Sequence, residues 1–281
     1  MLIFTQIAAL QKHLKPYIKQ GKTIGFVPTM GALHRGHIFL IQKSIKEADL
    51  TVCSIFVNPT QFNDPADFDK YPSTVPADVE KLNKAKCDIL FLPSVKEMYP
   101  DGTQNKRKVD FGFLAQTLEG EHRPGHFDGM AQVVERLLRI VKPHLLYMGL
   151  KDYQQQLIVG KLIAKRKLRV KLMALKTVRE RDGLALSSRN VRLNVEQRKV
   201  AVQLSKALRR SKYYLKTGTE IASAQLSGRK KLEKNKEIEI EYFEIRNANT
   251  LAVPKSRKEK MVALVAAKVG GVRLIDNMRM W

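Results

Sequence analysis

The sequence contains little cysteine and no long apolar run. Its 281 residues include only two cysteines, Cys53 and Cys87, with no CxxC spacing and no Cys/His cluster around them. This excludes a disulfide-stapled scaffold, and the apolar run TVCSIFV around Cys53 predicts a buried thiol in a reducing, cytoplasmic setting. No run reaches the roughly 18 uncharged apolar residues that a membrane span needs. No small-residue cleavage site follows the N-terminal segment, so we expect no targeting peptide.

Acidic side chains are scarce relative to basic ones. The chain has 51 Lys+Arg against 27 Asp+Glu, a net charge of +24. Residues 1–194 contribute +13 (31 basic minus 18 acidic) and residues 195–281 contribute +11 (20 minus 9). Two interpretations stay open: a nucleic-acid-binding surface, or the lysine-rich surface of an enzyme with an anionic substrate. Because no aromatic–basic RNA motif or zinc finger accompanies the charge, the sequence disfavours nucleic acid as a partner.

Short apolar runs alternate with amphipathic stretches over the first part of the chain. This alternation predicts an α/β fold whose parallel strands are covered on both faces. After a strand or turn and a helix within residues 1–22, strands are expected at 22–28, 50–57, 87–93, 144–149 and 170–178. Helices are expected at 37–48, 76–86, 127–141 and 152–167. We therefore predict a Rossmann-like parallel-sheet domain over residues 1–176.

The pattern of apolar and charged residues changes towards the C-terminus. Residues 195–235 are helical in pattern and rich in Lys and Arg, and strands are expected at 237–246, 260–269 and 272–278. Gly270-Gly271 marks a turn between the last two strands. The sequence thus predicts a smaller α+β domain over residues 177–281.

The segment PTMGALHRGH (28–37) lies between a predicted strand and a predicted helix, where α/β sheets bind nucleotides. Gly31 and Gly36 allow the backbone to approach a ligand, and Gly36 is expected just before a helix whose first amides are unpaired. His34 and His37 share one face and can donate to phosphate oxygens, which would stabilise a departing pyrophosphate. The alternative is a polar loop with two satisfied histidines, and the position between strand and helix favours function.

Two further segments suit the handling of phosphate charge. In GLKDYQQ, Lys151 follows a strand and can neutralise phosphate, while Asp152 can cap the next helix; the alternative is a surface lysine. In TVRERDGLALSSRN, the cluster Ser187, Ser188 and Arg189 suits a mobile clamp on a triphosphate. The alternative there is a helix cap and a surface arginine.

Two segments suit the recognition of a small acid. In IFVNPTQF, Asn58 and Gln61 follow a strand and offer neutral amides, which can bind hydroxyl groups and a carboxylate without an ion pair. In HRPGHF, Arg123 and His126 lie in a Pro-Gly turn before a helix.

Taken in order, these segments resemble the pantoate–β-alanine ligase family. The similarity runs through PTMGALHRGH, IFVNPTQF, YPDGT, RPGHFDG, GLKDYQQ, TVRERDGLALSSRN and RLIDN, and it covers nearly the whole chain. The family belongs to the HxGH nucleotidyltransferases, which are similar in their nucleotide site to class I aminoacyl-tRNA synthetases. The resemblance implies condensation of (R)-pantoate with β-alanine, using ATP and Mg²⁺, through a pantoyl adenylate with release of AMP and pyrophosphate. It also implies a cytoplasmic homodimer formed by the larger domain, and a smaller domain that closes over the site.

The resemblance also implies a set of site residues. His37 is the assigned active-site residue, and the other catalytic candidates are His34, Lys151, Ser187, Ser188 and Arg189. Nucleotide contacts fall on Met30, Gly31, Ala32, Leu33, His34, Arg35, Gly36, His37, Gly149, Leu150, Lys151, Asp152, Val178, Leu186, Ser187, Ser188 and Arg189. Gln61 and Gln155 match positions that bind pantoate, with Gln61 also near β-alanine, and Asn58 and Arg123 are further substrate-binding candidates.

The sequence departs from the family pattern at a few positions. Ser73 stands where arginine is common, and Ala77-Asp78 replaces an acidic pair, which leaves Asp78 as the candidate magnesium contact. Met148 and Leu186 are mild packing changes. A related adenylyltransferase acting on a phosphorylated pantetheine would share the HxGH segment but would not need the glutamines. The family offers no account of the net charge.

Overall fold

The computed structural model describes residues 1–62, 68–103 and 109–281, which form two compact units. The N-terminal unit comprises Met1–Leu150 and Gln154–Lys176, and the C-terminal unit comprises Lys151–Tyr153 and Thr177–Trp281. The boundary between a larger domain (1–176) and a smaller domain (177–281) stays a prediction.

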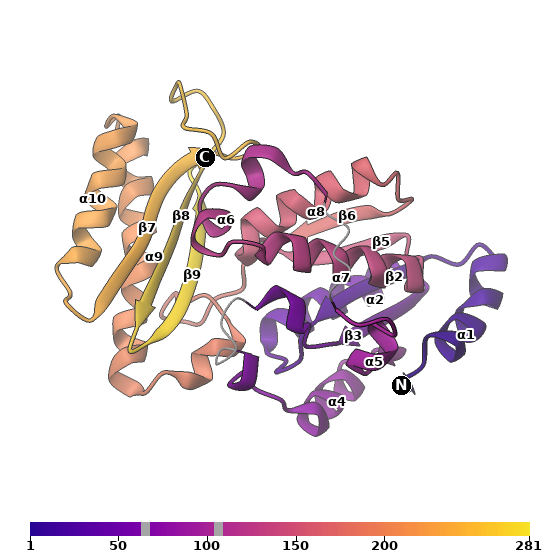
Figure 1. The fold of residues 1–281 in the computed structure, drawn as a ribbon. Helices are drawn as coiled ribbons and strands as arrows, with labels where there is room; N and C mark the ends of the chain where they lie inside the picture. The colour runs from indigo at the N-terminus through magenta and orange to yellow at the C-terminus, as the bar shows by residue number, and fades with distance from the viewer. Residues whose placement is uncertain (63–67, 104–108) are drawn as a thin grey trace. The chain divides into compact units, whose positions relative to one another are not determined.

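The N-terminal unit is built on a six-stranded sheet in which all neighbouring strands run parallel, in the order β1-β4-β3-β2-β5-β6 (Figure 1). The strands are β1 (Leu2–Phe4), β2 (Ile24–Thr29), β3 (Leu50–Ile55), β4 (Ile89–Phe91), β5 (Leu145–Gly149) and β6 (Lys171–Leu175). The predicted Rossmann-like parallel sheet is therefore confirmed. Strand order reverses between β2 and β5, and α/β sheets bind ligands outside the carboxyl ends of the strands at such a point.

Helices cover both faces of this sheet. Alternate residues of its strands therefore pack into two separate hydrophobic cores, one on each face. Phe26 and Leu146 join the core that contains Leu137 of α7, whereas their neighbours Val27 and Tyr147 join the core of α2 and α4. The longer helices are α1 (Ile7–Lys19), α2 (Arg35–Glu47), α4 (Val75–Lys84), α7 (His126–Val141) and α8 (Tyr153–Lys165). Short turns of helix are η1 (Pro59–Gln61), α5 (Val95–Met98), η2 (Gly112–Ala115), α6 (Glu119–His122) and η3 (Leu150–Asp152).

The C-terminal unit contains an antiparallel sheet with strand order β7-β8-β9. Its strands are β7 (Ile238–Asn247), β8 (Met261–Val269) and β9 (Val272–Arg279), preceded by η4 (Ser188–Arg192), α9 (Val195–Lys216) and α10 (Ile221–Glu233). Both long helices pack against one face of the three curved strands (Figure 1). Gly270 and Gly271, with φ of +55° and +73°, make the β8–β9 turn, a conformation that glycine adopts without steric cost. The predicted smaller α+β fold is confirmed.

Both cysteines are free and buried, as the sequence predicts. Burial raises the pKa of both thiols, that of Cys87 to about 12. No helix within residues 1–62, 68–103 and 109–281 combines the length and the hydropathy that a membrane span requires.

Candidate functional site

The two histidines of the HxGH segment cap the helix that they precede. α2 begins at Arg35, so Gly36 lies inside its first turn. Nδ1 of His34 accepts the Gly36 N–H (3.1 Å), and Nδ1 of His37 accepts the His34 N–H (3.3 Å). The expectation that Gly36 precedes a helix with unpaired first amides is therefore wrong, because imidazole nitrogens accept two N–H groups at this end of the helix.

This capping fixes the tautomer of both rings. A neutral imidazole that accepts a hydrogen bond at Nδ1 carries its proton on Nε2. His34 and His37 therefore each carry a proton on Nε2, and their rings stack with centroids 4.0 Å apart. Two adjacent N–H donors directly after the central strand β2 suit the oxygens of a phosphate group.

The loop between β2 and α2 is held by a buried carboxylate. Asp78, on α4, is fully buried, and its Oδ2 and Oδ1 accept the N–H groups of Ala32 and Leu33, each at 2.8 Å. Thr74 Oγ1 also donates to Oδ2 (3.1 Å), and Lys81 Nζ donates to the Leu33 carbonyl (2.7 Å). Ala32 has a φ of +47°, a left-handed conformation that costs a residue with a Cβ about 1–2 kcal/mol. Asp78 thus stabilises an unfavourable backbone turn.

Among the residues that the structure describes, the side chains do not form a dedicated metal site. Both oxygens of Asp78, the candidate magnesium contact, already accept hydrogen bonds from the loop. Within the described ranges, no group of three or more His, Cys, Asp or Glu residues is placed to hold a metal ion.

A hollow of about 300 Å³ lies at the carboxyl ends of β2, β3 and β4. Its lining includes Met30 and Gly31 of the predicted nucleotide segment, together with Asp78. Ser73, one of the departures from the family pattern, also lines it. The hollow places these residues at the sheet edge where the predicted site belongs.

The η1 turn brings Gln61 to the nucleotide segment. Gln61 Nε2 donates to Met30 Sδ (2.7 Å), and its Oε1 accepts from Asn58 Nδ2 (3.3 Å). Asn58 is 1% exposed; its Nδ2 also donates to the Gly129 carbonyl (3.2 Å), and its Oδ1 accepts from the Tyr99 hydroxyl (2.9 Å). Burial raises the pKa of Tyr99, which keeps that hydroxyl protonated as a donor. Asn58 is thus bonded inside the protein, and it orients Gln61.

Arg123 also contacts the η1 turn. Its guanidinium donates to Glu119 Oε2 (3.4 Å), to His126 Nε2 (3.1 Å) and to the Gln61 carbonyl (3.4 Å). His126 Nδ1 lies 2.8 Å from the same carbonyl. The structure therefore brings together three of the four predicted substrate residues, Gln61, Asn58 and Arg123, and Arg123 contacts the main chain of Gln61.

The glutamines of GLKDYQQ have different environments. Gln155 is half-buried in the first turn of α8. Gln154 is buried: its Oε1 accepts the Glu119 N–H (3.1 Å), and its Nε2 donates to the carbonyls of Leu114 (2.7 Å) and Thr117 (2.8 Å). Sequence reasoning missed Gln154, although its place beside Gln155 was the available signal.

In the C-terminal unit, an isolated antiparallel β-bridge between Arg179 and Ala185 precedes the Ser-Ser-Arg cluster. The Leu186 N–H donates to the Val178 carbonyl (3.0 Å), which pairs two predicted nucleotide contacts. Ser187 is the N-cap of η4 and accepts the Arg189 N–H (3.3 Å), so the helix-cap alternative describes its local contact. Ser188 is buried within η4.

The RLIDN segment organises the same unit, and sequence reasoning gave it no role. Asp276 is buried, and its carboxylate accepts two hydrogen bonds from Arg179, at 2.7 and 2.8 Å. Asn277 Nδ2 donates to the Lys151 carbonyl (2.7 Å), and Lys151 Nζ lies 3.5 Å from Asp152 Oδ1. RLIDN therefore fixes the backbone at Lys151 as well as the bridge that leads to Ser187.

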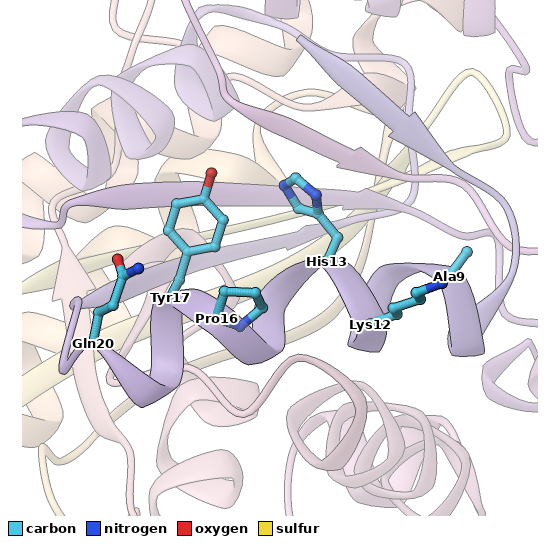
Figure 2. Close-up of a pocket in the computed structure, with 6 residues that line it drawn as sticks. All are labelled: Ala9, Lys12, His13, Pro16, Tyr17 and Gln20. Carbon is cyan, nitrogen blue, oxygen red and sulfur yellow. The ribbon is translucent and has the colours of Figure 1, made fainter.

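A second hollow, of about 640 Å³, lies along α1 (Figure 2). It is lined by Ala9, Lys12, His13, Pro16, Tyr17 and Gln20, with the rings of His13 and Tyr17 extending from the same side of the helix. None of these residues belongs to a predicted site, and the lining offers neither a carboxylate nor a strand-to-helix turn. We therefore place the candidate site at the carboxyl ends of the strands.

Comparison with known proteins is consistent along the whole chain. The family model described as pantoate-beta-alanine ligase matches residues 2–279. Pantothenate synthetases of Cytophaga hutchinsonii and Porphyromonas gingivalis are 44% and 42% identical over 281 residues, covering 99% of this chain and 99% of each relative.

Solved structures give the same result. The crystal structure of pantothenate synthetase from Thermus thermophilus is 39% identical, has a TM-score of 0.95 and covers 100% of both chains. A pantoate-beta-alanine ligase from Francisella tularensis, complexed with beta-gamma ATP and beta-alanine, is 36% identical with a TM-score of 0.84. That match covers 100% of this chain and 98% of the other.

Proposed function

Because this chain belongs to the pantoate–β-alanine ligase family, we propose that it condenses (R)-pantoate with β-alanine at the expense of ATP. In the first step, a pantoate carboxylate oxygen attacks the α-phosphorus of ATP, pyrophosphate leaves, and pantoyl adenylate forms. In the second step, the β-alanine amine attacks the activated carbonyl, loses a proton, and displaces AMP to give pantothenate. The protein contributes positioning and charge stabilisation to both steps.

The observation that carries this proposal is the stacked pair His34 and His37, capped at Nδ1 and protonated at Nε2. As pyrophosphate leaves, negative charge accumulates on its oxygens, and preorganised N–H donors stabilise that charge. His37 acts as a hydrogen-bond donor in this account, and no proton transfer from it is required. The donors lie at the carboxyl end of β2, beside the strand-order reversal where nucleotides bind.

Other residues complete the nucleotide set by family resemblance. Lys151, Ser187, Ser188 and Arg189 supply cationic and hydroxyl groups for the triphosphate. The remaining proposed nucleotide contacts are Met30, Gly31, Ala32, Leu33, Arg35, Gly36, Gly149, Leu150, Asp152, Val178 and Leu186.

Gln61 and Gln155 bind pantoate in this proposal, and Gln61 also faces β-alanine. The contact of Gln61 with Met30 supports it, because the amide then lies beside the nucleotide segment where the carboxylate must meet the α-phosphate. Asn58 and Arg123 contribute by holding the η1 turn. The Francisella tularensis relative, solved with beta-gamma ATP and beta-alanine, supports the choice of co-substrates.

The phosphates of ATP are the expected ligands of Mg²⁺ here, because Mg²⁺ is commonly bound through substrate phosphates and the described residues offer no carboxylate cluster. We also propose a cytoplasmic homodimer: two buried free thiols fit a reducing compartment, and the dimer rests on the family resemblance. We propose anionic substrates rather than nucleic acid as partners, because no aromatic–basic RNA motif or zinc finger accompanies the net charge of +24.

The test is AMP formation that requires pantoate, β-alanine and Mg-ATP together. His37→Ala should lower kcat by roughly 100- to 1000-fold, the usual cost of one lost donor to a developing negative charge. His144→Ala is the matched control, because His144 Nδ1 also accepts a backbone N–H (Ile24, 3.0 Å) but lies at the start of the strands. No pantoate-dependent AMP from folded protein, or equal losses in both variants, would overturn the proposal.

A further inference from the structure

We infer that His126 is a positioning residue for pantoate binding: its ring fixes the main-chain carbonyl of Gln61 and so orients the Gln61 amide. The inference rests on the proposed ligase function, since Gln61 is there a pantoate contact. His126 is 6% exposed, at the first position of α7, and is not itself proposed to contact substrate.

The hydrogen bonds around His126 determine which ring nitrogen carries the proton. Nδ1 lies 2.8 Å from the Gln61 carbonyl, which can only accept, so Nδ1 must donate. Nε2 lies 3.1 Å from Arg123 Nη1, which can only donate, so Nε2 must accept. His126 is therefore a neutral ring protonated at Nδ1. This tautomer is opposite to that of His34 and His37.

The arginine is held in turn by a buried carboxylate. Glu119 is 7% exposed, and its Oε2 accepts from Arg123 Nη1 (3.4 Å). Arg123 Nη2 also reaches the Gln61 carbonyl (3.4 Å), so that oxygen accepts from both the ring and the guanidinium. Two donors converging on one carbonyl define the plane of the peptide that follows Gln61, and hence the direction of its side chain.

The same chain of contacts reaches the second predicted pantoate glutamine. The Glu119 N–H donates to Gln154 Oε1 (3.1 Å), and Gln154 immediately precedes Gln155 in the first turn of α8. A continuous series of hydrogen bonds thus connects the backbone at both glutamines through Glu119, Arg123 and His126. Displacing one member shifts the spacing of the two amides, which is the property that recognition of a small acid depends on.

The test compares two isosteric replacements. An asparagine amide lies near the place of a histidine Nδ1, and a glutamine amide near that of Nε2. His126→Asn should keep the donor to Gln61 and hold the pantoate KM within about threefold of wild type. His126→Gln should lose the donor to the Gln61 carbonyl and raise the pantoate KM about tenfold, the effect of one hydrogen bond. In the same variant, kcat and the ATP KM should change by less than about threefold. His122→Gln, at an exposed neighbouring histidine, should match wild type.

A wild-type pantoate KM in His126→Gln, or equal impairment in the asparagine variant, would overturn the inference. Inactive wild-type protein would instead refute the proposed function. Long-range ¹H–¹⁵N spectra of histidine-labelled wild-type protein test the positioning contacts without any variant or activity. They should show a ring protonated at Nδ1 that persists in His122→Gln. A spectrum in which all rings carry the proton on Nε2 would refute the inference even if the variants fail to fold.

Discussion

Replacing Asp78 by asparagine removes a charge and one acceptor while keeping the side-chain shape. The carboxylate accepts the Ala32 and Leu33 N–H groups, each at 2.8 Å, one on each oxygen. Asparagine offers one oxygen, so its NH₂ group must face one of these N–H donors in a fully buried position. The variant therefore leaves a buried donor unsatisfied and weakens the anchor of the left-handed turn at Ala32.

The magnitude follows from these contacts. A hydrogen bond to a charged group contributes about 1.5–3 kcal/mol, and an unsatisfied buried donor costs about 1–3 kcal/mol more. We expect the free energy of unfolding of the N-terminal unit to fall by about 3 kcal/mol. For a unit of this size, that lowers the Tm by roughly 6–12 °C.

The assay is thermal unfolding followed by circular dichroism, in EDTA and without nucleotide, so that a role in metal binding contributes nothing. Asp88→Asn is the matched control: its exposed carboxylate also accepts a backbone N–H (Thr51, 2.8 Å), and the variant should lose less than about 1 kcal/mol. A wild-type Tm for Asp78→Asn, combined with a raised Mg²⁺ requirement in turnover, would refute the loop role and restore Asp78 as a metal contact.

Two further predictions concern packing. A Cβ added at Gly129 would lie 2.1 Å from the Thr60 carbonyl oxygen, so Gly129→Ala should displace η1 and lower the free energy of unfolding by about 1–3 kcal/mol. The control is Gly160→Ala, which should be neutral or stabilising because the nearest atom to the added Cβ is 3.8 Å away. Equal denaturation midpoints for the two variants would contradict this prediction. Burial raises the pKa of Cys87 to about 12 and that of Cys53 well above its usual value, so at pH 8 about one Cys87 in ten thousand is a thiolate. Ellman's reagent should therefore label neither thiol until the protein unfolds, and rapid labelling of native protein would show that the burial is wrong.

The sequence predicts the sheet well because its strands are buried on both faces. Runs such as the one at 50–57 are almost uninterrupted in apolar character, and β3 (Leu50–Ile55) is buried throughout. Helices α2, α4, α7 and α8 lie within two residues of their predicted bounds, since each has an amphipathic period and a clear break. The start of α2 was placed two residues late, because the first turn carries Arg35 and Gly36 rather than the usual signals of a helix N-terminus.

The sequence identifies which polar side chains matter near the site better than it identifies their hydrogen-bond partners. Asn58 is expected at the sheet edge, where the structure has it, and Asp78 is expected as a magnesium contact, but both side chains bond the protein's own backbone. Their partners, Gly129 and Ala32, are distant in sequence and are brought close only by tertiary packing. The local sequence around such a polar residue is the same whether its side chain binds a ligand or the protein's own backbone. Sequence alone therefore does not separate the two roles.

The central claim is that a pantoyl adenylate forms before the amine arrives. The direct measurement is exchange of labelled pyrophosphate into ATP with pantoate present and β-alanine absent. We expect exchange that requires pantoate and Mg²⁺ and that falls at least about 100-fold in His37→Ala, in line with the loss of one preorganised donor. Folded wild-type protein that forms pantothenate yet shows no exchange without β-alanine would contradict it.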